Sequence, residues 1–376
     1  MAAAALGRLA SPVAVVTTVG MYLDGGRLDL PANYRGYVSL MRSCLDRGGR
    51  YAAAEMTSEA LALGFAKAWP CRVGVFTNLT RDHLDSHQSA EHYLASKAQL
   101  FVHLPAGGTA VLNACDPSSE LLAEVVPAGV RILRYGIPSR GTPAGQLDVA
   151  ASAVTVSWEG TTVEISGEAL PRRLAIRAIG HVFAENALAA LAAAVASGVD
   201  APAAAAAIGD IAPPSGRFEV VATRPYVVVD FAHTPDALAR TLATARNLCT
   251  GTLTVVFGAG GGRDRAKRPL MGGAAAVADR VILTSDNPRH ESAAAIADEI
   301  RAGISDTRSV RVVLDRAEAI RQAVREAEES DAILIAGRGH ETEQIVGDRR
   351  VPFSDQEVAR GAVNARQTAT APIENS

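Results

Sequence analysis

Short continuous runs of apolar residues alternate with helical patterns along most of the chain. The runs of the first half lie at 13–19, 50–56, 71–79 and 108–113, and those of the second half lie at 226–230, 252–257, 280–285, 310–314 and 332–336. Continuous apolar runs of this length are typical of strands that are buried inside a parallel sheet. Because helical spacing separates them, we expect an α/β fold with right-handed β–α–β connections.

The segment 131–180 has a different pattern, in which β-branched and polar residues alternate on both sides of Gly160. This alternation predicts antiparallel hairpins, which would form a β annex to the first, mostly parallel sheet. Further along, Pro213-Pro214-Ser215-Gly216 has the composition of a hinge between two domains.

With 376 residues, of which 48% are hydrophobic, the chain is long enough to form two separate cores. We expect one α/β domain over 1–213 and a second, Rossmann-like domain over 214–365. Residues 366–376 are polar and aperiodic, which predicts a disordered tail.

Charge and composition limit the classes of partner that we expect the chain to bind. The formal net charge is -3, and no basic block is interleaved with aromatic residues, so neither nucleic acid nor an anionic membrane is indicated as a partner. The alanine-rich run 187–208 is interrupted by Gly198, Asp200 and Pro202, which predicts two helices and not a membrane span. Four cysteines are scattered without C-x-x-C spacing, as in proteins of a reducing compartment. We therefore expect a cytoplasmic monomer that binds small molecules.

One lysine lies at an unusual position. The helical pattern after residue 90 places Lys97 on the same face as Tyr93, Leu94, Leu100 and Phe101, although helices usually turn charges to water. The chain has only three lysines, and this one follows a cluster of side chains that can bind metal, at Asp82, His83, Asp85 and His87. Lys97 is thus a candidate for chemistry, and the alternative is a lysine whose stem covers apolar surface while its amine reaches water.

Polar residues follow the predicted strands at the end where α/β sheets bind their ligands. Glu55 and Asn78 follow two strands of the first domain, and we expect them to face one crevice with His83. In the second domain the corresponding polar residues begin at Asp230, Arg263, Asp286 and Arg338. Part of this signal is structural, because Thr234-Pro235 and Asp315 have the pattern of helix starts.

The segment Phe257–Pro269, FGAGGGRDRAKRP, is a glycine-rich loop after a strand. It is not a P-loop, because Gly-Lys-Ser/Thr occurs nowhere in the chain. Glycines that let the backbone approach a ligand, followed by arginines, suit a carboxylate or a phosphate. The alternative is a flexible, solvated loop.

Seven sequence motifs recur in order between residues 13 and 360: TNLTRDHLDSH, HYLASK, SGRFEV, VDFAHTPDAL, FGAGGGRDRAKRPLM, TSDNPRHE and AGRGHET. Together they resemble the Mur ligase family, and most of all those members that add the third residue of the peptidoglycan stem peptide. The resemblance implies ATP-dependent formation of an amide bond through an acyl phosphate, with Mg²⁺ to offset the repulsion between a carboxylate and a triphosphate. It also implies a P-loop-ATPase-like central domain and a C-terminal domain that binds the incoming amino acid.

The resemblance assigns roles to individual residues of the first domain. Lys97 matches a lysine that is carbamylated by CO₂ and so becomes an anionic, catalytic Mg²⁺ ligand. His83 matches the histidine that shares this metal, and Glu55 matches the glutamate of a second Mg²⁺ site. Asn186 matches an asparagine that contacts adenine.

It also assigns roles in the second domain. Arg217 matches a catalytic arginine that reaches the ATP phosphates, Asp230 an aspartate that binds ribose, and His233 lies in the same loop. The residues matched to binding of the incoming amino acid are Arg263, Asp286, Asn287, Arg289, Gly337 and Glu341. The DNPR sequence at 286–289 resembles the type that adds meso-diaminopimelate more than the type that adds lysine.

Several positions depart from the family pattern. The P-loop and the UDP-binding domain are expected to precede Met1, so the central domain would be truncated at its N-terminus. Glu59 replaces a family histidine, Leu30-Pro31-Ala32-Asn33 replaces a threonine-rich segment, Phe183 replaces an asparagine and Arg338 replaces a lysine.

Three hypotheses follow from these departures. The chain belongs to a ligase of peptidoglycan synthesis whose recorded start is too late, to a related ligase that makes a natural product, or to a non-catalytic protein that keeps an amino-acid pocket. Because backbone amides and the lysine of a P-loop hold the phosphates, we expect residues 1–376 alone to show no ATP-dependent ligation. We also expect poor stability of this isolated chain, because a sheet without a central strand has an exposed edge.

Overall fold

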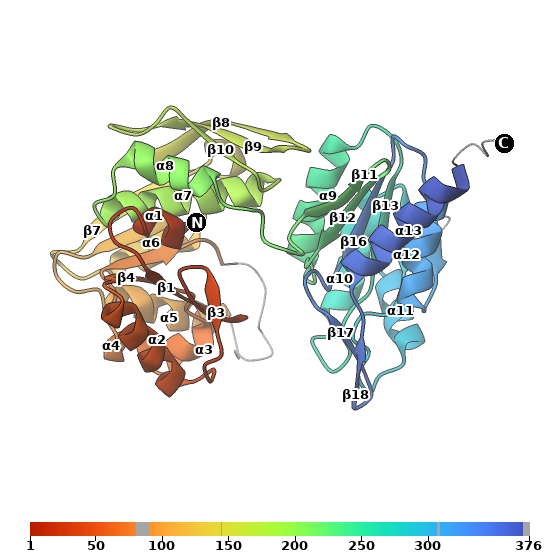
Figure 1. Cartoon of the computed structure of the whole chain (residues 1–376), viewed down its shortest axis with the longest axis horizontal. Helices are drawn as coiled ribbons and strands as arrows, with labels where there is room; N and C mark the ends of the chain where they lie inside the picture. Colours follow the sequence, from red (N-terminus) through yellow and green to blue (C-terminus); the bar gives the residue numbers. More distant parts are fainter. Residues whose placement is uncertain (80–89, 144, 307–308, 371–376) are drawn as a thin grey trace. The chain divides into compact units, whose positions relative to one another are not determined.

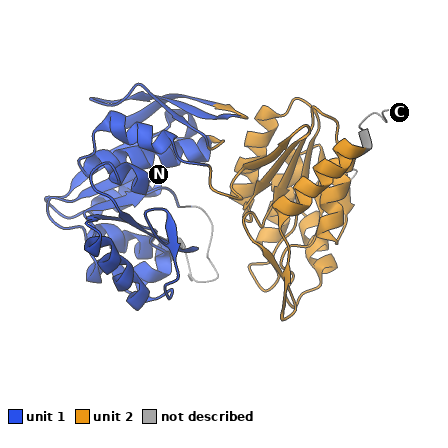
Figure 2. Ribbon diagram, viewed as in Figure 1, with its two compact units in different colours: residues 1–155, 159–177, 181–212 blue, residues 156–158, 178–180, 213–376 orange. Residues whose placement is uncertain are grey.

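The computed structural model describes residues 1–79, 90–143, 145–306 and 309–370. The chain forms two compact units (Figure 2). Unit 1 consists of residues 1–155, 159–177 and 181–212, and unit 2 consists of 156–158, 178–180 and 213–376. Each unit is a layered α/β structure (Figure 1), and the predicted α/β class is confirmed.

The first sheet of unit 1 has four strands in the order β3-β2-β1-β4. β1 (Val13–Thr17) and β4 (Tyr51–Ala54) are parallel and are connected through α2 (Tyr34–Asp46). Between β1 and α2, β2 (Gly20–Leu23) and β3 (Gly26–Leu28) form an antiparallel extension. The side chain of Asn33 caps α2, and Leu40 and Cys44 of this helix pack on the sheet.

The second sheet of unit 1 has six strands in the order β10-β9-β8-β7-β6-β5. Its strands are β5 (Val73–Phe76), β6 (Thr109–Asn113), β7 (Arg131–Gly136), β8 (Val149–Ser157), β9 (Gly160–Ser166) and β10 (Arg173–Ile176). The strands β5 to β8 are parallel, and β9 and β10 form an antiparallel pair.

The prediction of antiparallel hairpins throughout 131–180 is therefore correct for β8, β9 and β10, because residues 158–159 join β8 directly to its neighbour β9, and wrong for β7, which pairs in parallel with β6 and β8. β7 follows a helical crossover, α6 (Ser118–Glu124), and buries Leu133 and Tyr135 as an inner strand of the parallel sheet does. Local alternation could not reveal this, because the pairing partner β6 lies before the crossover.

The helices of unit 1 pack on these sheets or on one another. They are α1 (Ala2–Leu6), α3 (Ser58–Ala62), α4 (Phe65–Ala68), α5 (Ala90–Val102), α7 (His181–Ala196) and α8 (Ala201–Gly209), with a 3₁₀ turn at Pro138–Arg140. α7 contacts β5, β6 and β7, and its alanines are buried against them. Within the described part of the chain, no helix has the length and apolar character needed to cross a membrane.

Unit 2 contains a six-stranded sheet in the order β11-β12-β16-β13-β14-β15. Its strands are β11 (Glu219–Thr223), β12 (Tyr226–Asp230), β13 (Leu253–Phe257), β14 (Arg280–Leu283), β15 (Val310–Val312) and β16 (Ala332–Ala336). All neighbours are parallel except β11 and β12, which confirms the predicted Rossmann-like arrangement. A short antiparallel hairpin, β17 (Glu343–Val346) and β18 (Arg349–Pro352), follows β16.

Helices cover both faces of this sheet. They are α9 (Pro235–Leu248), α10 (Lys267–Ala274), α11 (Ala293–Arg301), α12 (Arg316–Glu326) and α13 (Asp355–Thr370), with a 3₁₀ turn at Ala275–Val277. Val227 and Ile333 pack with residues of α12 and α13, and the alternate residues Val228 and Leu334 are also buried. Continuous burial along the strands explains why their sequence shows no alternation.

The C-terminal helix corrects one prediction. α13 extends to Thr370, so residues 366–370 are helical and do not belong to a disordered tail. Arg366 donates hydrogen bonds to the carbonyl oxygens of Val324 (2.8 Å) and Ala327 near the end of α12. This tertiary contact stabilises a helical turn whose sequence alone is too polar to predict it.

Candidate functional site

Two loops of unit 2 meet beyond the carboxyl ends of β13 and β14. The Gly261 amide donates to the carbonyl oxygen of Asn287 (2.9 Å), and Nη1 of Arg289 donates to the carbonyl oxygen of Gly261 (2.7 Å). A Cβ atom on Gly261 would lie 1.9 Å from the carbonyl oxygen of Pro288, so only glycine allows this approach. The glycine-rich loop is therefore packed against the DNPR loop and is not a flexible, solvated segment.

A third loop, after β16, joins them. Nδ2 of Asn287 donates to Oε2 of Glu341 (2.8 Å), and Arg338 Nη1 donates to Oδ1 of Asn287 (3.0 Å). At Gly337, where φ is +114°, an added Cβ would lie 2.6 Å from Oδ2 of Asp286. The structure thus brings five of the six residues matched to amino-acid binding into one cluster.

Arg263, the sixth, lies on the same glycine-rich loop. A Cβ atom on Gly260 would lie 3.0 Å from Nη1 of Arg289 and 3.8 Å from Cγ of Arg263. Both arginines therefore flank Gly260. The arrangement combines two guanidinium groups with two carboxylates, which suits a small molecule that carries charges of both signs.

The backbone of Arg289 is strained, with φ at +53°. Its amide donates to the carbonyl oxygen of Ile345 (3.1 Å), and its carbonyl oxygen accepts from the amide of Gly347 (2.7 Å). The β17–β18 hairpin holds this conformation by bonding to both sides of the residue. Strain that the surroundings hold in place is common at binding sites.

A buried arginine joins the two loops that carry Arg263 and Arg289. Arg268 is fully buried and forms two hydrogen bonds of 2.9 Å to the carboxylate of Glu291, and its Nη2 donates to the carbonyl oxygen of Gly260 (3.3 Å). Oε1 of Glu291 also accepts from the Gly262 amide (2.6 Å). Bonds from Arg268 and from Gly262 lower the pKa of Glu291 from its usual 4.5 to about 2. Sequence reasoning missed this pair, although Glu291 closes the DNPRHE motif.

A second buried ion pair, which sequence reasoning also missed, supports the strand ends at the site. Arg316 donates from Nε and Nη2 to the two carboxylate oxygens of Asp355 at 2.7 and 2.8 Å, and both side chains are fully buried. Arg316 also donates to the carbonyl oxygens of Ser285 (3.2 Å) and Ala336 (3.0 Å). These carbonyls immediately precede Asp286 and Gly337, so the pair fixes the strand ends that carry site residues.

The residues matched to nucleotide binding in unit 2 surround Phe231. The guanidinium carbon of Arg217 lies 4.4 Å from the centre of the Phe231 ring, and the rings of His233 and His340 lie 4.6 and 5.3 Å from it. A Cβ atom on Gly216 would lie 2.1 Å from the amide nitrogen of His340. The loop of Arg217 is thus packed directly on the loop that carries Glu341.

Asp230 is buried and its carboxylate accepts three hydrogen bonds from the protein. The donors are the amides of Phe218 (2.7 Å) and Ala232 (2.8 Å) and the hydroxyl of Thr241 (3.2 Å). Burial raises the pKa of Asp230, against the hydrogen bonds that lower it. The bonds from Phe218 and Ala232 also hold the backbone on both sides of the Asp230 carboxylate, beside Arg217.

The matched residues of unit 1 lie on neighbouring elements. Glu55 follows β4 and is exposed, and its Oε2 accepts from the amide (2.9 Å) and the hydroxyl (3.2 Å) of Thr18. The helix that follows, α3, packs on α5, where Lys97 is half-buried with its Nζ 5.0 Å from the centre of the Tyr93 ring. Asn186 is half-buried on α7. His83, with Asp82, Asp85 and His87, lies outside the described residues.

Whether these residues suit Mg²⁺ depends on their donor atoms. Glu55 offers carboxylate oxygens, which Mg²⁺ prefers, whereas a lysine ammonium has no lone pair to offer. Within the described residues, no three His, Cys, Asp or Glu side chains gather closely enough to hold a metal ion. Lys97 therefore fits a metal site only in the carbamylated form.

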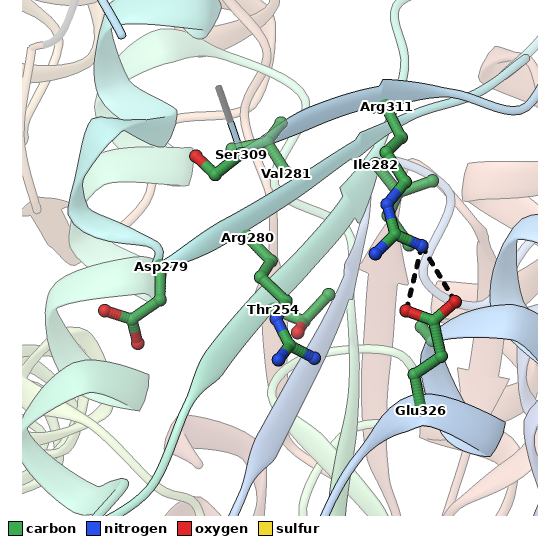
Figure 3. A pocket seen from close by; sticks show the side chains of 9 residues that line it. Thr254, Asp279, Arg280, Val281, Ile282, Ser309, Arg311 and Glu326 are labelled. Atoms are coloured by element: carbon green, nitrogen blue, oxygen red, sulfur yellow. Dashed lines mark hydrogen bonds and ion pairs between the residues drawn. The ribbon is translucent and has the colours of Figure 1, made fainter. Parts of the chain in front are cut away.

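A cavity of about 270 Å³ lies elsewhere in unit 2 (Figure 3), at the amino ends of β13, β14 and β15. Arg311, which lines it, is paired with Glu326 at 2.8 and 2.9 Å. The other lining residues are Thr254, Asp279, Arg280, Val281, Ile282, Ser309 and Ala323. Because no predicted site residue lines this cavity, we place the functional site at the carboxyl ends of the strands.

The fold and the cluster define an α/β protein whose Rossmann-like unit gathers side chains of both charge signs at the carboxyl ends of its strands. Residues 1–194 match the Mur ligase middle domain, and residues 216–339 match the domain described as Mur ligase, glutamate ligase domain. The chain belongs to the Mur ligase family, which confirms the resemblance of the sequence motifs.

Two similar curated proteins carry the same name. A relative from Synechococcus elongatus is 41% identical over 335 residues, which are 88% of this chain and 66% of the relative. One from Geobacillus thermodenitrificans is 38% identical over 338 residues, 87% of this chain and 67% of the relative. Both are named UDP-N-acetylmuramoyl-L-alanyl-D-glutamate--2,6-diaminopimelate ligase. The chain spans about two thirds of the length of these curated relatives.

Solved structures are similar as well. A structure of a ligase with the same name is 32% identical and has a TM-score of 0.66, with 97% of this chain and 75% of that chain covered. Folylpolyglutamate synthase of Mycobacterium tuberculosis is 19% identical with a TM-score of 0.68, covering 99% of this chain and 88% of its own. The second likeness concerns the fold alone.

Proposed function

We propose that this chain is the ATP-using and amino-acid-binding part of a ligase that joins meso-diaminopimelate to the free carboxylate of a UDP-MurNAc-dipeptide in peptidoglycan precursor synthesis. The observation that carries the proposal is the cluster in unit 2 in which Asn287 bonds to Glu341, and Arg263 and Arg289 both lie beside Gly260. The names of the relatives point to the same substrates.

The chemistry of the cluster suits a diamino dicarboxylic acid. Guanidinium groups of Arg263 and Arg289 can bind carboxylates, and the carboxylates of Asp286 and Glu341 can accept hydrogen bonds from ammonium groups. Asp286 and Asn287 are buried, so a bound amino acid would be held where electrostatic interactions are strong. An amine held in one orientation loses less entropy on reaching the activated carboxylate.

For the nucleotide, family membership assigns Asn186 of unit 1 to adenine, and in unit 2 Arg217 to the phosphates and Asp230 to ribose, with His233 in the same loop as Asp230. Two Mg²⁺ ions, one held by His83 and carbamylated Lys97 and the other by Glu55, would supply the positive charge that lets a carboxylate approach a triphosphate. Both roles follow from the family membership and the donor atoms of these residues. The substrates are water-soluble small molecules, and we propose a cytoplasmic monomer.

Binding of the free amino acid tests the proposal, because it uses residues of unit 2 and requires no nucleotide turnover. By isothermal titration calorimetry, we expect the chain to bind meso-diaminopimelate at least about tenfold more tightly than L-lysine, which lacks the second carboxylate. Arg289→Met should abolish this preference, and Arg349→Met on the hairpin surface is the control. Equal affinity for the two amino acids, or binding of neither, would reject the proposal.

A further inference from the structure

Arg338, the position at which the family has lysine, is fully buried beneath the amino-acid cluster. Its Nη1 donates to Oδ1 of Asn287 (3.0 Å). Its Nη2 donates to the carbonyl oxygens of Glu343 (2.7 Å) and Phe353 (3.3 Å), and the guanidinium carbon lies 5.4 Å from the centre of the Phe353 ring. One side chain thus contacts Asn287 and the two ends of the β17–β18 hairpin.

These contacts determine how the carboxamide of Asn287 is oriented. Its Oδ1 accepts from Arg338 and from the amide of Ile345 (2.8 Å), and its Nδ2 donates to Oε2 of Glu341 (2.8 Å). A guanidinium and a backbone amide can only donate, and a carboxylate can only accept. If the carboxamide were rotated by 180°, its NH₂ group would face two other donors and its oxygen would face the carboxylate of Glu341. The NH₂ group must therefore face Glu341.

We propose that Arg338 is a positioning residue, which fixes Asn287 as a hydrogen-bond donor in the amino-acid site and ties the β17–β18 hairpin to that site. That the site binds meso-diaminopimelate rests on the proposed function. The hairpin in turn holds Arg289 through its backbone bonds to Ile345 and Gly347. Arg338 therefore supports two binding residues without itself being accessible to a ligand.

The surroundings of Arg338 explain why arginine and lysine differ here. Burial and then the charge of Arg316 lower the pKa of Arg338, whereas the carboxylates of Asp286, Asp355 and Glu341 raise it. An arginine remains protonated throughout the physiological range, so its donors persist. Its Nε has no hydrogen-bond partner among the described residues, which costs stability. The planar guanidinium nevertheless bonds to three acceptors, and the single ammonium of a lysine could not bond to all three with the same geometry.

The test compares Arg338→Met and Arg338→Lys with Arg350→Met, which removes an exposed arginine from the same hairpin. Hydrogen exchange at the Ile345 amide reports the bond to Asn287, and calorimetry with meso-diaminopimelate reports the site. For Arg338→Met we expect exchange at least about tenfold faster and affinity at least about tenfold weaker, since bonds to a charged group are lost. Arg338→Lys should keep affinity within about threefold and accelerate exchange across 343–353. Arg350→Met should change neither.

Four results would contradict the positioning role of Arg338 or the proposed function. If Arg338→Met leaves exchange at Ile345 and affinity as in the parent, the proposal is wrong. If exchange rises equally over both units, Arg338 acts on general stability and the positioning role is rejected. A parent chain that does not bind meso-diaminopimelate rejects the proposed function, and exchange at Ile345 still decides the role of Arg338. If Arg338→Met does not fold, unchanged hairpin exchange in Arg338→Lys would contradict the proposal.

Discussion

Glu291 shows how a single residue of the site can make the protein sensitive to acid. Its carboxylate binds Arg268 and the Gly262 amide, which lower its pKa from the usual 4.5 to about 2. A carboxylate whose pKa is lower in the folded state contributes stability that is fully present above pH 4.5 and is lost as the pH falls toward 2. The two loops that carry Arg263 and Arg289 should therefore weaken together in acid.

We expect Glu291→Gln to be less stable than the parent at pH 6 and to approach it as the pH falls below 4.5. Urea denaturation at pH 6, 4.5 and 3 measures this difference in unfolding midpoint. Glu318→Gln is the control, because the ion pairs of Glu318 with Arg321 and Arg325 lie at the surface. A difference that stays constant across this range would contradict the assigned role of Glu291.

Among individual residues, the sequence indicated the candidate binding residues better than the residues that support them. Asp286, Asn287 and Glu341 could be predicted because they follow buried strands in a doubly wound pattern. Arg268 and Arg316 could not, because each lies at a helix start and resembles an ordinary solvated arginine. Their roles depend on carboxylates 23 and 39 residues further along the chain, which only the folded structure brings to them.

The Arg316–Asp355 pair acts between elements. It joins the first residue of α12 to the first residue of α13, and Arg316 also bonds to the carbonyl oxygens after β14 and at the end of β16. Removing one partner of a buried ion pair leaves the other charge unpaired in a low-dielectric interior. The two helices and the strand ends should therefore lose stability together.

We expect Arg316→Met to lower the free energy of unfolding by about 3–5 kcal/mol, as measured by urea denaturation. The double variant Arg316→Met with Asp355→Leu should recover much of this loss, since no buried charge remains unpaired. The control is Arg311→Met in β15, because the pair of Arg311 with Glu326 of α12 is partly exposed and its loss should cost only about 0–1 kcal/mol. Equal costs for the two arginine variants would mean that burial of the pair is not what matters.

Elements could be predicted wherever burial is continuous. The bounds of β12 and β16 agree with the predicted runs, because both strands are buried on two faces. β11 and the β17–β18 hairpin were not predicted. Every residue of β18 is exposed, and the hairpin is held by Arg338 and by the backbone of Arg289, which are contacts made by tertiary structure. The helical turn 366–370 depends on Arg366 in the same way.

For the whole molecule, the division into two units predicts which functions can be separated by mutation. All residues of the amino-acid cluster lie in unit 2, whereas Glu55, Lys97 and Asn186 lie in unit 1. Substitutions at sites that share no interaction partners have nearly additive effects. Binding of the free amino acid, in the absence of nucleotide, should therefore not depend on the residues assigned to Mg²⁺ and adenine.

We expect Glu55→Gln and Lys97→Ala each to leave the affinity for meso-diaminopimelate within about twofold of the parent, because an uncoupled substitution contributes less than about 0.5 kcal/mol. Asn287→Leu should weaken binding at least about tenfold, since it removes a donor from the site together with the hydrogen bonds that the carboxamide makes to Nη1 of Arg338 and to Oε2 of Glu341. Calorimetry on the complete chain, with Lys67→Ala as an exposed lysine control, measures all four variants. A large loss of affinity in Lys97→Ala but not in Lys67→Ala would show that the amino-acid site extends to unit 1. Both the assignment of the cluster to unit 2 alone and the separation of the two functions would then have to be abandoned.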